Sequence, residues 1–492
     1  NFLNKKIRMQ IIGSYTFTPL DKLIKVKGLL YNLNIEIFFG DFDNYHSEIL
    51  SPKSDLLDFK PDFIFLFISQ NKIKYMGEIT DSKETIFQWV ENEINIFSNL
   101  INVIHEKLKT EVYISNLIQD FEENYGVLTS SLPASNYNFI RFFNTKLLDI
   151  CQSNTFILDL ELVSSKLGLN KVLDYKNWYI SKQIGSIDFQ IAISNHISNI
   201  LNNRTSAMEK VLILDLDNTI WGGVIGDDGI DGIEIGNTSP IGEAFKDFQS
   251  YIKKLKDIGV LLAVCSKNES RNAKLPFIKH PEMILKLKDF VSFKANWKPK
   301  SENIKAIAND LNLGLDSMVF IDDNPAEIEQ VNQFVPDVKT ICLFDDPTQF
   351  KIKLKNSIFF EPRSITKEDK RKTELYRTEE KRKKLKNQSI DLTDYLKTLD
   401  MKLEIIEFRN IDVSRISQLI NKSNQFNLTT IRRNENDIKE MINSKNYIGF
   451  SFRLIDKFSD HGLIGVYILE KQKKDLIIDT FIMSCRVLER QV

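Results

Sequence analysis

The sequence of 492 residues has little of several features that would assign it to a specialised class of protein. It has only four cysteines, at positions 151, 265, 342 and 485, and no C-x-x-C pair. This spacing argues against a disulfide framework and against a zinc site. The sequence also lacks an uncharged apolar run long enough to cross a bilayer, and its N-terminus lacks the apolar stretch of a signal peptide.

An excess of charge of either sign is absent as well. The 66 Lys and Arg residues almost balance the 67 Asp and Glu residues, which leaves a formal net charge of -1. A balanced chain has no overall attraction to nucleic acid or to an anionic membrane. Together these absences predict a soluble, cytoplasmic protein without a nucleic-acid or membrane partner.

A chain of 492 residues is longer than those that fold around a single hydrophobic core, so we expect several domains. The first of them alternates short apolar runs, such as Phe63–Ile68, with longer amphipathic segments, such as Thr85–Leu108. That alternation is typical of an α/β domain with a mainly parallel sheet. The predicted divisions are an α/β domain at 1–205, a second α/β domain at 206–360, a charged helical linker at 361–398 and a third domain at 399–492.

A pair of carboxylates follows the first strand of the second domain. The run Val211–Leu214 is apolar on both faces, as a buried parallel strand is, and it leads into Asp215, Asp217 and Thr219. Ligands of open α/β sheets bind at the carboxyl ends of the strands. Two carboxylates that close repel each other unless a cation lies between them, and Mg²⁺ with phosphate oxygens would supply it. The alternative interpretation is an acidic turn without a ligand.

Two later strands end in polar residues of matching chemistry. The strand Gly259–Val264 leads to Cys265 and Ser266, whose hydroxyl could hold a phosphate oxygen, and Met318–Ile321 leads to a second acidic pair. Between them, Asn296-Trp-Lys-Pro-Lys300 supplies cations ahead of an amphipathic helix. Asp323 could instead serve only as a helix cap before Asn324-Pro325.

In this order, the four segments resemble the motifs of the haloacid dehalogenase (HAD) superfamily over about residues 210–345. The resemblance implies that Asp215 accepts a phosphoryl group as an aspartyl phosphate and that Asp217 is the general acid and base. It also implies binding of the phosphoryl group by Thr219, Ser266 and Lys300, with Lys298 as the alternative to Lys300. The implied Mg²⁺ ligands are Asp215, Asp217, Asp322 and Asp323.

A narrower resemblance rests on the loop Trp221-Gly-Gly-Val-Ile-Gly-Asp-Asp-Gly229 together with Val264-Cys-Ser-Lys-Asn268 and Phe320-Ile-Asp-Asp-Asn-Pro325. These segments closely resemble the FkbH-like proteins, and the likeness covers essentially Lys210 to the end of the chain, with a weaker likeness before it. It implies an enzyme that removes phosphate from an acyl phosphate such as 1,3-bisphosphoglycerate. The glyceryl group would be held as an enzyme thioester and passed to the phosphopantetheine thiol of an acyl carrier protein.

The thioester requires a cysteine nucleophile, and two candidates remain open. Cys265 lies next to Ser266 at a strand end, where a small backbone adjustment could bring its sulfur to the same crevice. Because side chains alternate along a strand, Cys265 would instead point into the packing if Ser266 faces the phosphate. Cys485 is the second candidate.

The flanking domains resemble two further folds. Residues 1–205 have the expected shape of a flavodoxin-like or SGNH-like domain, without the Asp and His that would activate Ser14 for hydrolysis. The segment from about Leu399 resembles an incomplete N-acetyltransferase (GNAT)-like α+β domain, in which Glu489 and Gln491 stand where glycines are expected. The predicted fold class is therefore a multidomain α/β protein with a HAD-like parallel sheet at its centre.

Two other functions stay open beside the Mg²⁺-dependent phosphatase and glyceryltransferase. One is a simple phosphatase or phosphotransferase with accessory domains, which would release phosphate without forming a thioester. The other is a non-catalytic protein that docks an acyl carrier protein.

Overall fold

The structure is a computed structural model, and it describes the chain except at 1–4, 120–124, 152–153, 207, 345, 364, 366, 387–395, 397–398, 423–431, 458, 473–474, 485–486 and 488–492. The chain divides into two compact units, Asn1–Thr205 and Ser206–Val492.

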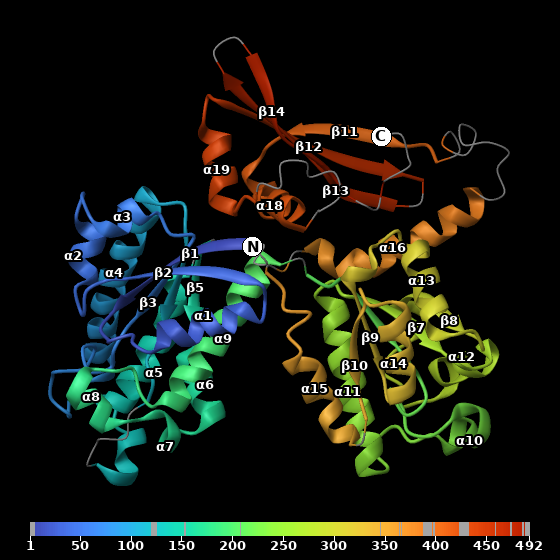
Figure 1. Ribbon diagram of the computed structural model, residues 1–492, viewed down its shortest axis with the longest axis horizontal. Helices are drawn as coiled ribbons and strands as arrows, with labels where there is room; N and C mark the ends of the chain where they lie inside the picture. The colour runs from blue at the N-terminus through green and yellow to red at the C-terminus, as the bar shows by residue number, and fades with distance from the viewer. Residues whose placement is uncertain are drawn as a thin grey trace. The chain divides into compact units, whose positions relative to one another are not determined.

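The first unit is built on a five-stranded sheet in the order β2-β1-β3-β4-β5 (Figure 1). All neighbouring strands in it are parallel. This is the strand order of flavodoxin-like folds, in which the direction of winding reverses beside the first strand. The strands are β1 (Lys5–Gly13), β2 (Leu33–Phe39), β3 (Phe63–Phe67), β4 (Glu111–Ser115) and β5 (Thr155–Leu158).

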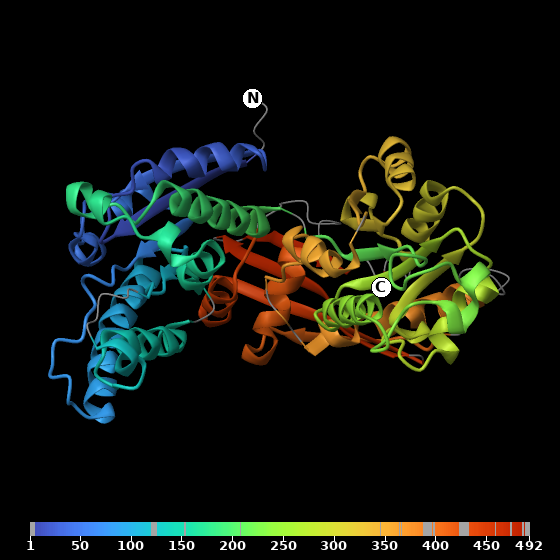
Figure 2. The ribbon, with the colours of Figure 1, turned by 90° about the horizontal axis from the view of Figure 1, so that it is seen from below.

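Helices cover both faces of this sheet, as parallel strands require (Figure 2). One apolar cluster joins the sheet to α1, α6 and α9, and another joins it to α2, α4 and α5. The helices of the unit are α1 (Leu20–Leu29), α2 (Tyr45–Leu50), α3 (Asp55–Phe59), α4 (Lys83–Lys107), α5 (Asn136–Lys146), α6 (Leu160–Leu167), α7 (Leu169–Val172), α8 (Tyr175–Ser181) and α9 (Ile187–Thr205).

The second unit contains another five-stranded parallel sheet, in the order β10-β9-β6-β7-β8. Its strands are β6 (Val211–Leu214), β7 (Leu261–Ser266), β8 (Phe290–Ala295), β9 (Met318–Asp322) and β10 (Lys339–Cys342). The central strand β6 is buried over its whole length, which explains its run of four apolar residues. Its neighbours on the two sides are β9 and β7, so their carboxyl ends meet at one edge.

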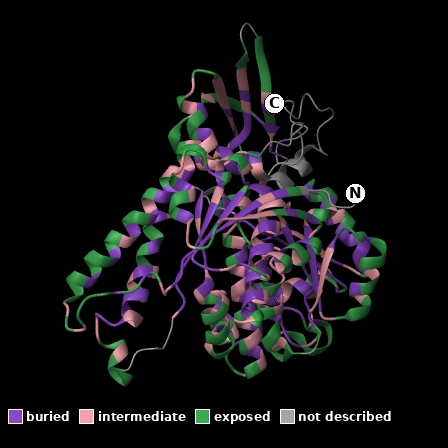
Figure 3. Ribbon diagram, turned by 60° about the vertical axis from the view of Figure 1, so that its left-hand side comes forward, coloured by how far each residue is buried: buried purple, intermediate pink, exposed green. Residues whose placement is uncertain are grey.

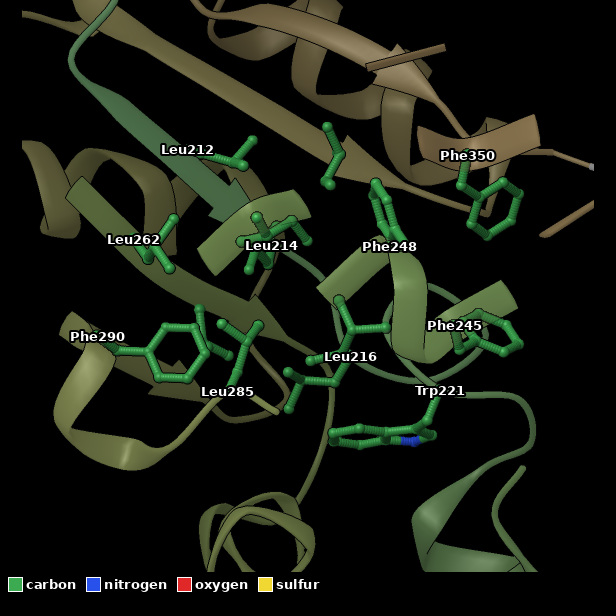
Figure 4. Packing of buried hydrophobic residues seen from close by; sticks show 14 of the residues in the cluster. Leu212, Leu214, Leu216, Trp221, Phe245, Phe248, Leu262, Leu285, Phe290 and Phe350 are labelled. Carbon is green, nitrogen blue, oxygen red and sulfur yellow. The ribbon is translucent and has the colours of Figure 1, made fainter. Parts of the chain in front are cut away.

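Two apolar clusters sandwich the second sheet, whose strands β6, β7 and β9 are buried throughout. Figure 3 colours the ribbon of the chain by burial, with buried residues in purple. Side chains of α11, α12 and α15 pack on one face, and those of α13 and α14 on the other. Figure 4 shows part of the first cluster, in which Phe245, Phe248 and Phe350 meet edge to face. The helices are α10 (Ile225–Gly232), α11 (Pro240–Asp257), α12 (Ser270–Lys279), α13 (Lys300–Leu311), α14 (Pro325–Phe334), α15 (Phe350–Asn356) and α16 (Lys367–Lys386).

The same unit also contains a four-stranded antiparallel sheet in the order β11-β12-β13-β14. A small apolar cluster joins this sheet to α18 and α19. The elements are β11 (Lys402–Glu407), α18 (Val413–Lys422), α19 (Glu435–Asn443), β12 (Tyr447–Asp456), β13 (Ser459–Gln472) and β14 (Asp475–Met483). The GNAT-like assignment of this region stays a prediction.

The predicted fold class, a multidomain α/β chain with parallel sheets, is confirmed by these two sheets. One strand of the first unit, β4, is additional to those predicted. Within the described part of the chain, no helix is both long and apolar enough to span a bilayer.

We predict that Phe248→Ala destabilises the second unit by about 3–5 kcal/mol, because the fully buried ring leaves a cavity beside Phe350. Denaturant unfolding followed by circular dichroism measures the change. Phe344→Ala is the matched control, since that ring is 54% exposed, and we expect a change of about 0.5 kcal/mol or less. Equal effects of the two substitutions would contradict the packing described.

Candidate active site

Polar side chains gather where three neighbouring strands of the second unit end. Asp215 follows β6 directly, Ser266 is the last residue of β7, and Asp322 is the last residue of β9. All three are buried, with 6%, 2% and 0% of their surface exposed. Since the strands are adjacent and parallel, their ends bring these residues to one edge of the sheet.

Lys300 places a positive charge between two of these residues. It is the first residue of α13 and is only 3% exposed. Its Nζ lies 2.9 Å from Asp215 Oδ1 and also forms an ion pair with Asp322. Burial alone would lower the pKa of Lys300, but the two carboxylates outweigh it and raise that pKa above its usual value. Lys300 is therefore a fixed cation at the centre of the site.

Asp323 adds a third carboxylate to the group. One oxygen each of Asp215, Asp322 and Asp323 lie within 4.8 Å of one another. Burial, followed by the charge of Asp215, raises the pKa of both Asp322 and Asp323. One lysine thus leaves the repulsion among three carboxylates only partly compensated. A hard divalent cation with oxygen ligands fits this donor set, so Asp215, Asp322 and Asp323 could hold Mg²⁺.

The carboxylate of Asp217 is not part of that group. Its Oδ1 accepts hydrogen bonds from Trp221 Nε1 (2.9 Å) and from the backbone N–H of Ile225 (3.0 Å). Its Oδ2 accepts one from Asn268 Nδ2 at 2.7 Å. Burial raises the pKa of Asp217 above its usual value despite these donors. The side chain is thus oriented by its own partners, and its prediction as a metal ligand gains no support from the described carboxylate group.

The remaining predicted phosphate ligands lie at the same edge. The fully buried Thr219 donates its hydroxyl to Asp323 Oδ1 at 3.3 Å, which ties the loop after β6 to the end of β9. Lys298, the alternative to Lys300, is exposed and lies outside the ion pairs of Asp215 and Asp322. The ammonium group at this site therefore comes from Lys300.

Of the two placements left open for Cys265, the structure has the one in the packing, and the role of Cys265 as an acyl-carrying nucleophile stays a prediction. Its side chain is fully buried in the apolar cluster under α13 and α14, and its Sγ contacts the backbone oxygen of Lys300 at 3.6 Å. Burial raises the pKa of the thiol strongly, whereas a nucleophile needs the thiolate. Alternation along β7 explains the placement, because Cys265 and Ser266 point to opposite faces. Cys485, the other candidate, lies outside the described residues.

Sequence reasoning missed the partners of Asp217. Trp221 stood out only as part of a glycine-rich loop, and Asn268 only as the residue after Ser266-Lys267. The spacing of Trp221 could have indicated its contact with Asp217. A side-chain donor four residues after an aspartate can fold back on it when glycines such as Gly222 and Gly223 follow and let the chain turn. Gly223 has φ +88°, and a Cβ there would lie 2.6 Å from Asp228 Oδ2.

The chain is similar to a known family and to a solved structure that contains a phosphatase domain. The family model of the FkbH N-terminal domain matches residues 8–202. The crystal structure of the N-terminal part of the protein BF1531 from Bacteroides fragilis, which contains a phosphatase domain complexed with Mg, is similar at 34% identity and a TM-score of 0.65. That match covers 73% of this chain and 95% of the other. No curated protein matches the chain.

Two other solved structures are much less similar to this chain. An uncharacterized protein from Corynebacterium glutamicum has 15% identity and a TM-score of 0.22, over 32% of this chain and 98% of its own. BT4096, a gut microbial diltiazem-metabolizing enzyme, has 11% identity and a TM-score of 0.30, over 43% of this chain and 50% of its own.

We predict that Lys300→Met destabilises the second unit by about 3–5 kcal/mol, because Asp215 and Asp322 lose their buried counter-charge. Added Mg²⁺ should restore part of the loss, since a cation that binds only the folded state stabilises it. Thermal unfolding with and without Mg²⁺ measures both effects. Lys298→Met is the matched control, two residues away and exposed, and equal stability of the two variants would contradict the network.

Proposed function

Because this chain belongs to the FkbH-like proteins with a HAD-like phosphatase domain, we propose that it is a Mg²⁺-dependent phosphatase in which Asp215 accepts the phosphoryl group. The observation that carries the proposal is the ion-pair network of Lys300 with Asp215 and Asp322 at the ends of neighbouring parallel strands. An aspartate that is buried next to a fixed cation can approach a phosphate dianion without the repulsion that two free anions meet.

Asp215, Asp322 and Asp323 are the proposed holders of the metal. The oxygens of the buried Asp215 and Asp322 and of the partly buried Asp323 form a hard, anionic donor set, and the Bacteroides fragilis relative is described as a complex with Mg. When bound there, Mg²⁺ would neutralise the carboxylates and polarise a phosphoryl oxygen.

Each side chain of this site has its own role in the proposed phosphoryl transfer. An oxygen of Asp215 attacks phosphorus, the bond from phosphorus to the leaving oxygen breaks, and Asp217 gives that oxygen a proton. Ser266 and Lys300 stabilise the charge on the phosphoryl oxygens. In the second step Asp217 takes a proton from water, whose oxygen attacks phosphorus. The bond to Asp215 breaks, and inorganic phosphate leaves.

We further propose a class of substrate and an acceptor for its acyl group. The likeness of the loops to FkbH-like proteins suggests an acyl phosphate, such as 1,3-bisphosphoglycerate, and the phosphopantetheine thiol of an acyl carrier protein. Loading of that thiol breaks a different bond from phosphoryl transfer. The sulfur must attack the acyl carbon, so that the carbon–oxygen bond breaks and phosphate is the leaving group. In this branch the same residues hold the departing phosphate.

The position of Cys265 bears on how the acyl group reaches the carrier. A buried sulfur with a raised thiol pKa is a poor acyl carrier in this conformation. We therefore propose that the acyl group passes either through Cys485 or directly to the thiol of the carrier.

For the phosphatase reaction, we predict that Asp215→Asn lowers phosphate release from 4-nitrophenyl phosphate by more than about a thousandfold, because the amide cannot form the aspartyl phosphate. Chelation of Mg²⁺ in the unaltered protein should have a similar effect. Asp316→Asn, at an exposed aspartate in the turn before β9, is the control. Retained turnover in Asp215→Asn would contradict the proposal.

For acyl loading, we predict that incubation with 1,3-bisphosphoglycerate, Mg²⁺ and a phosphopantetheine-bearing carrier yields a glyceryl adduct on the carrier that hydroxylamine removes. Intact mass measurement detects it. Cys265→Ala should retain the adduct, and Cys485→Ala should lose it only if Cys485 is an intermediate carrier. Phosphate release without any adduct would leave the simple phosphatase as the function, and loss of the adduct in a folded Cys265→Ala variant would restore Cys265 as the nucleophile.

A further inference from the structure

Three hydrogen-bond donors from two loops hold the side chain of Asp217. Trp221 Nε1 and the backbone N–H of Ile225 donate to Oδ1, and Asn268 Nδ2 donates to Oδ2. Donors on both oxygens fix the rotation of the carboxyl group as well as its position. This is more than a half-buried aspartate needs to be satisfied, because one of its oxygens could have remained hydrated.

The side chain of Trp221 is fixed by its surroundings, so it can hold Asp217 in one position. Its side chain is fully buried and meets the ring of Phe277 edge to face at 5.6 Å (Figure 4 shows its place in the cluster). The backbone on both sides is fixed as well. Gln249 Nε2 donates to the oxygen of Ile220 at 2.7 Å, and Gly222 exchanges two backbone hydrogen bonds with Glu234.

Asn268 reaches Asp217 from the segment after β7. It is 5% exposed and stands two residues after Ser266, the predicted phosphate ligand. One short segment therefore supplies both a hydroxyl for the phosphoryl group and a donor that orients Asp217. Any movement of this segment displaces both groups together.

We propose that Trp221 and Asn268 are positioning residues, which hold the carboxyl of Asp217 where it can exchange a proton with the leaving-group oxygen. This inference rests on the proposed phosphoryl transfer at Asp215. Proton transfer requires the acid within hydrogen-bond distance of the leaving oxygen, so a freely rotating carboxyl would spend little time in the productive orientation.

A positioning role of Trp221 and Asn268 has a consequence that a purely structural role would not have. A leaving group that is stable as an anion needs no proton, so its departure should depend little on the orientation of Asp217. A basic leaving group needs the proton and should depend on it strongly. Substituted phenyl phosphates vary the basicity of the leaving group with little change in shape, and kcat/KM reports the steps through formation of the aspartyl phosphate.

The experiment compares Asn268→Ala and Trp221→Phe with the unaltered protein over this series, from 4-nitrophenyl phosphate to phenyl phosphate. Phe keeps an aromatic ring against Phe277 but removes the indole N–H. We expect kcat/KM for phenyl phosphate to fall about 10- to 100-fold and that for 4-nitrophenyl phosphate to change less than about threefold. Asn272→Ala is the matched control, because Asn272 donates to Glu269 at the surface.

The outcomes separate this inference from the function on which it rests. An equal loss with every substrate in both variants would overturn the positioning role, as would no loss at all. If Trp221→Phe does not fold, Asn268→Ala alone decides by the same comparison. Absence of turnover by the unaltered protein would overturn the proposed phosphatase function, and the positioning role with it.

Discussion

The candidate site depends on the ammonium group of Lys300, which lies between the carboxylates of Asp215 and Asp322 in a buried position. Two buried carboxylates without a counter-charge would cost several kcal/mol, and a lysine buried alone would lose its proton. The three groups are therefore stable as charges only together. Because they come from α13, β6 and β9, the same ion pairs also hold this helix against the ends of two strands.

The rest of the site follows from that arrangement. Adjacent parallel strands deliver Asp215, Ser266 and Asp322 to one edge, where Asp323 adds the excess negative charge that a divalent cation would balance. The loop after β6 turns back on itself at Gly222 and Gly223, and so it returns Trp221 to Asp217. Asp215 and Asp217 are thereby placed in different surroundings, one beside Lys300 and the other among the donors Trp221 and Asn268.

The sequence was sufficient to predict the α/β class and the gathering of Asp215, Ser266, Lys300 and Asp322, because each follows a strand or begins a helix with a clear apolar pattern. Strand alternation left two readings of Cys265, and only the packing of α13 and α14 against β7 decides between them. The contact of Asn268 with Asp217 could not be predicted, since Asn268 reaches it across the edge of the sheet, whereas the spacing of Trp221 from Asp217 was a usable signal. The strand β4 was not predicted, although Val112, Tyr113 and Ile114 are all buried in the sheet.

Chemical trapping can show whether Asp215 carries the phosphoryl group during turnover. Borohydride reduces an aspartyl phosphate to homoserine, which peptide mass spectrometry locates in the sequence. We expect homoserine at position 215 after the protein is incubated with 4-nitrophenyl phosphate and Mg²⁺, and none when either is left out. An unchanged Asp215 during active turnover, or homoserine at another aspartate, would contradict it.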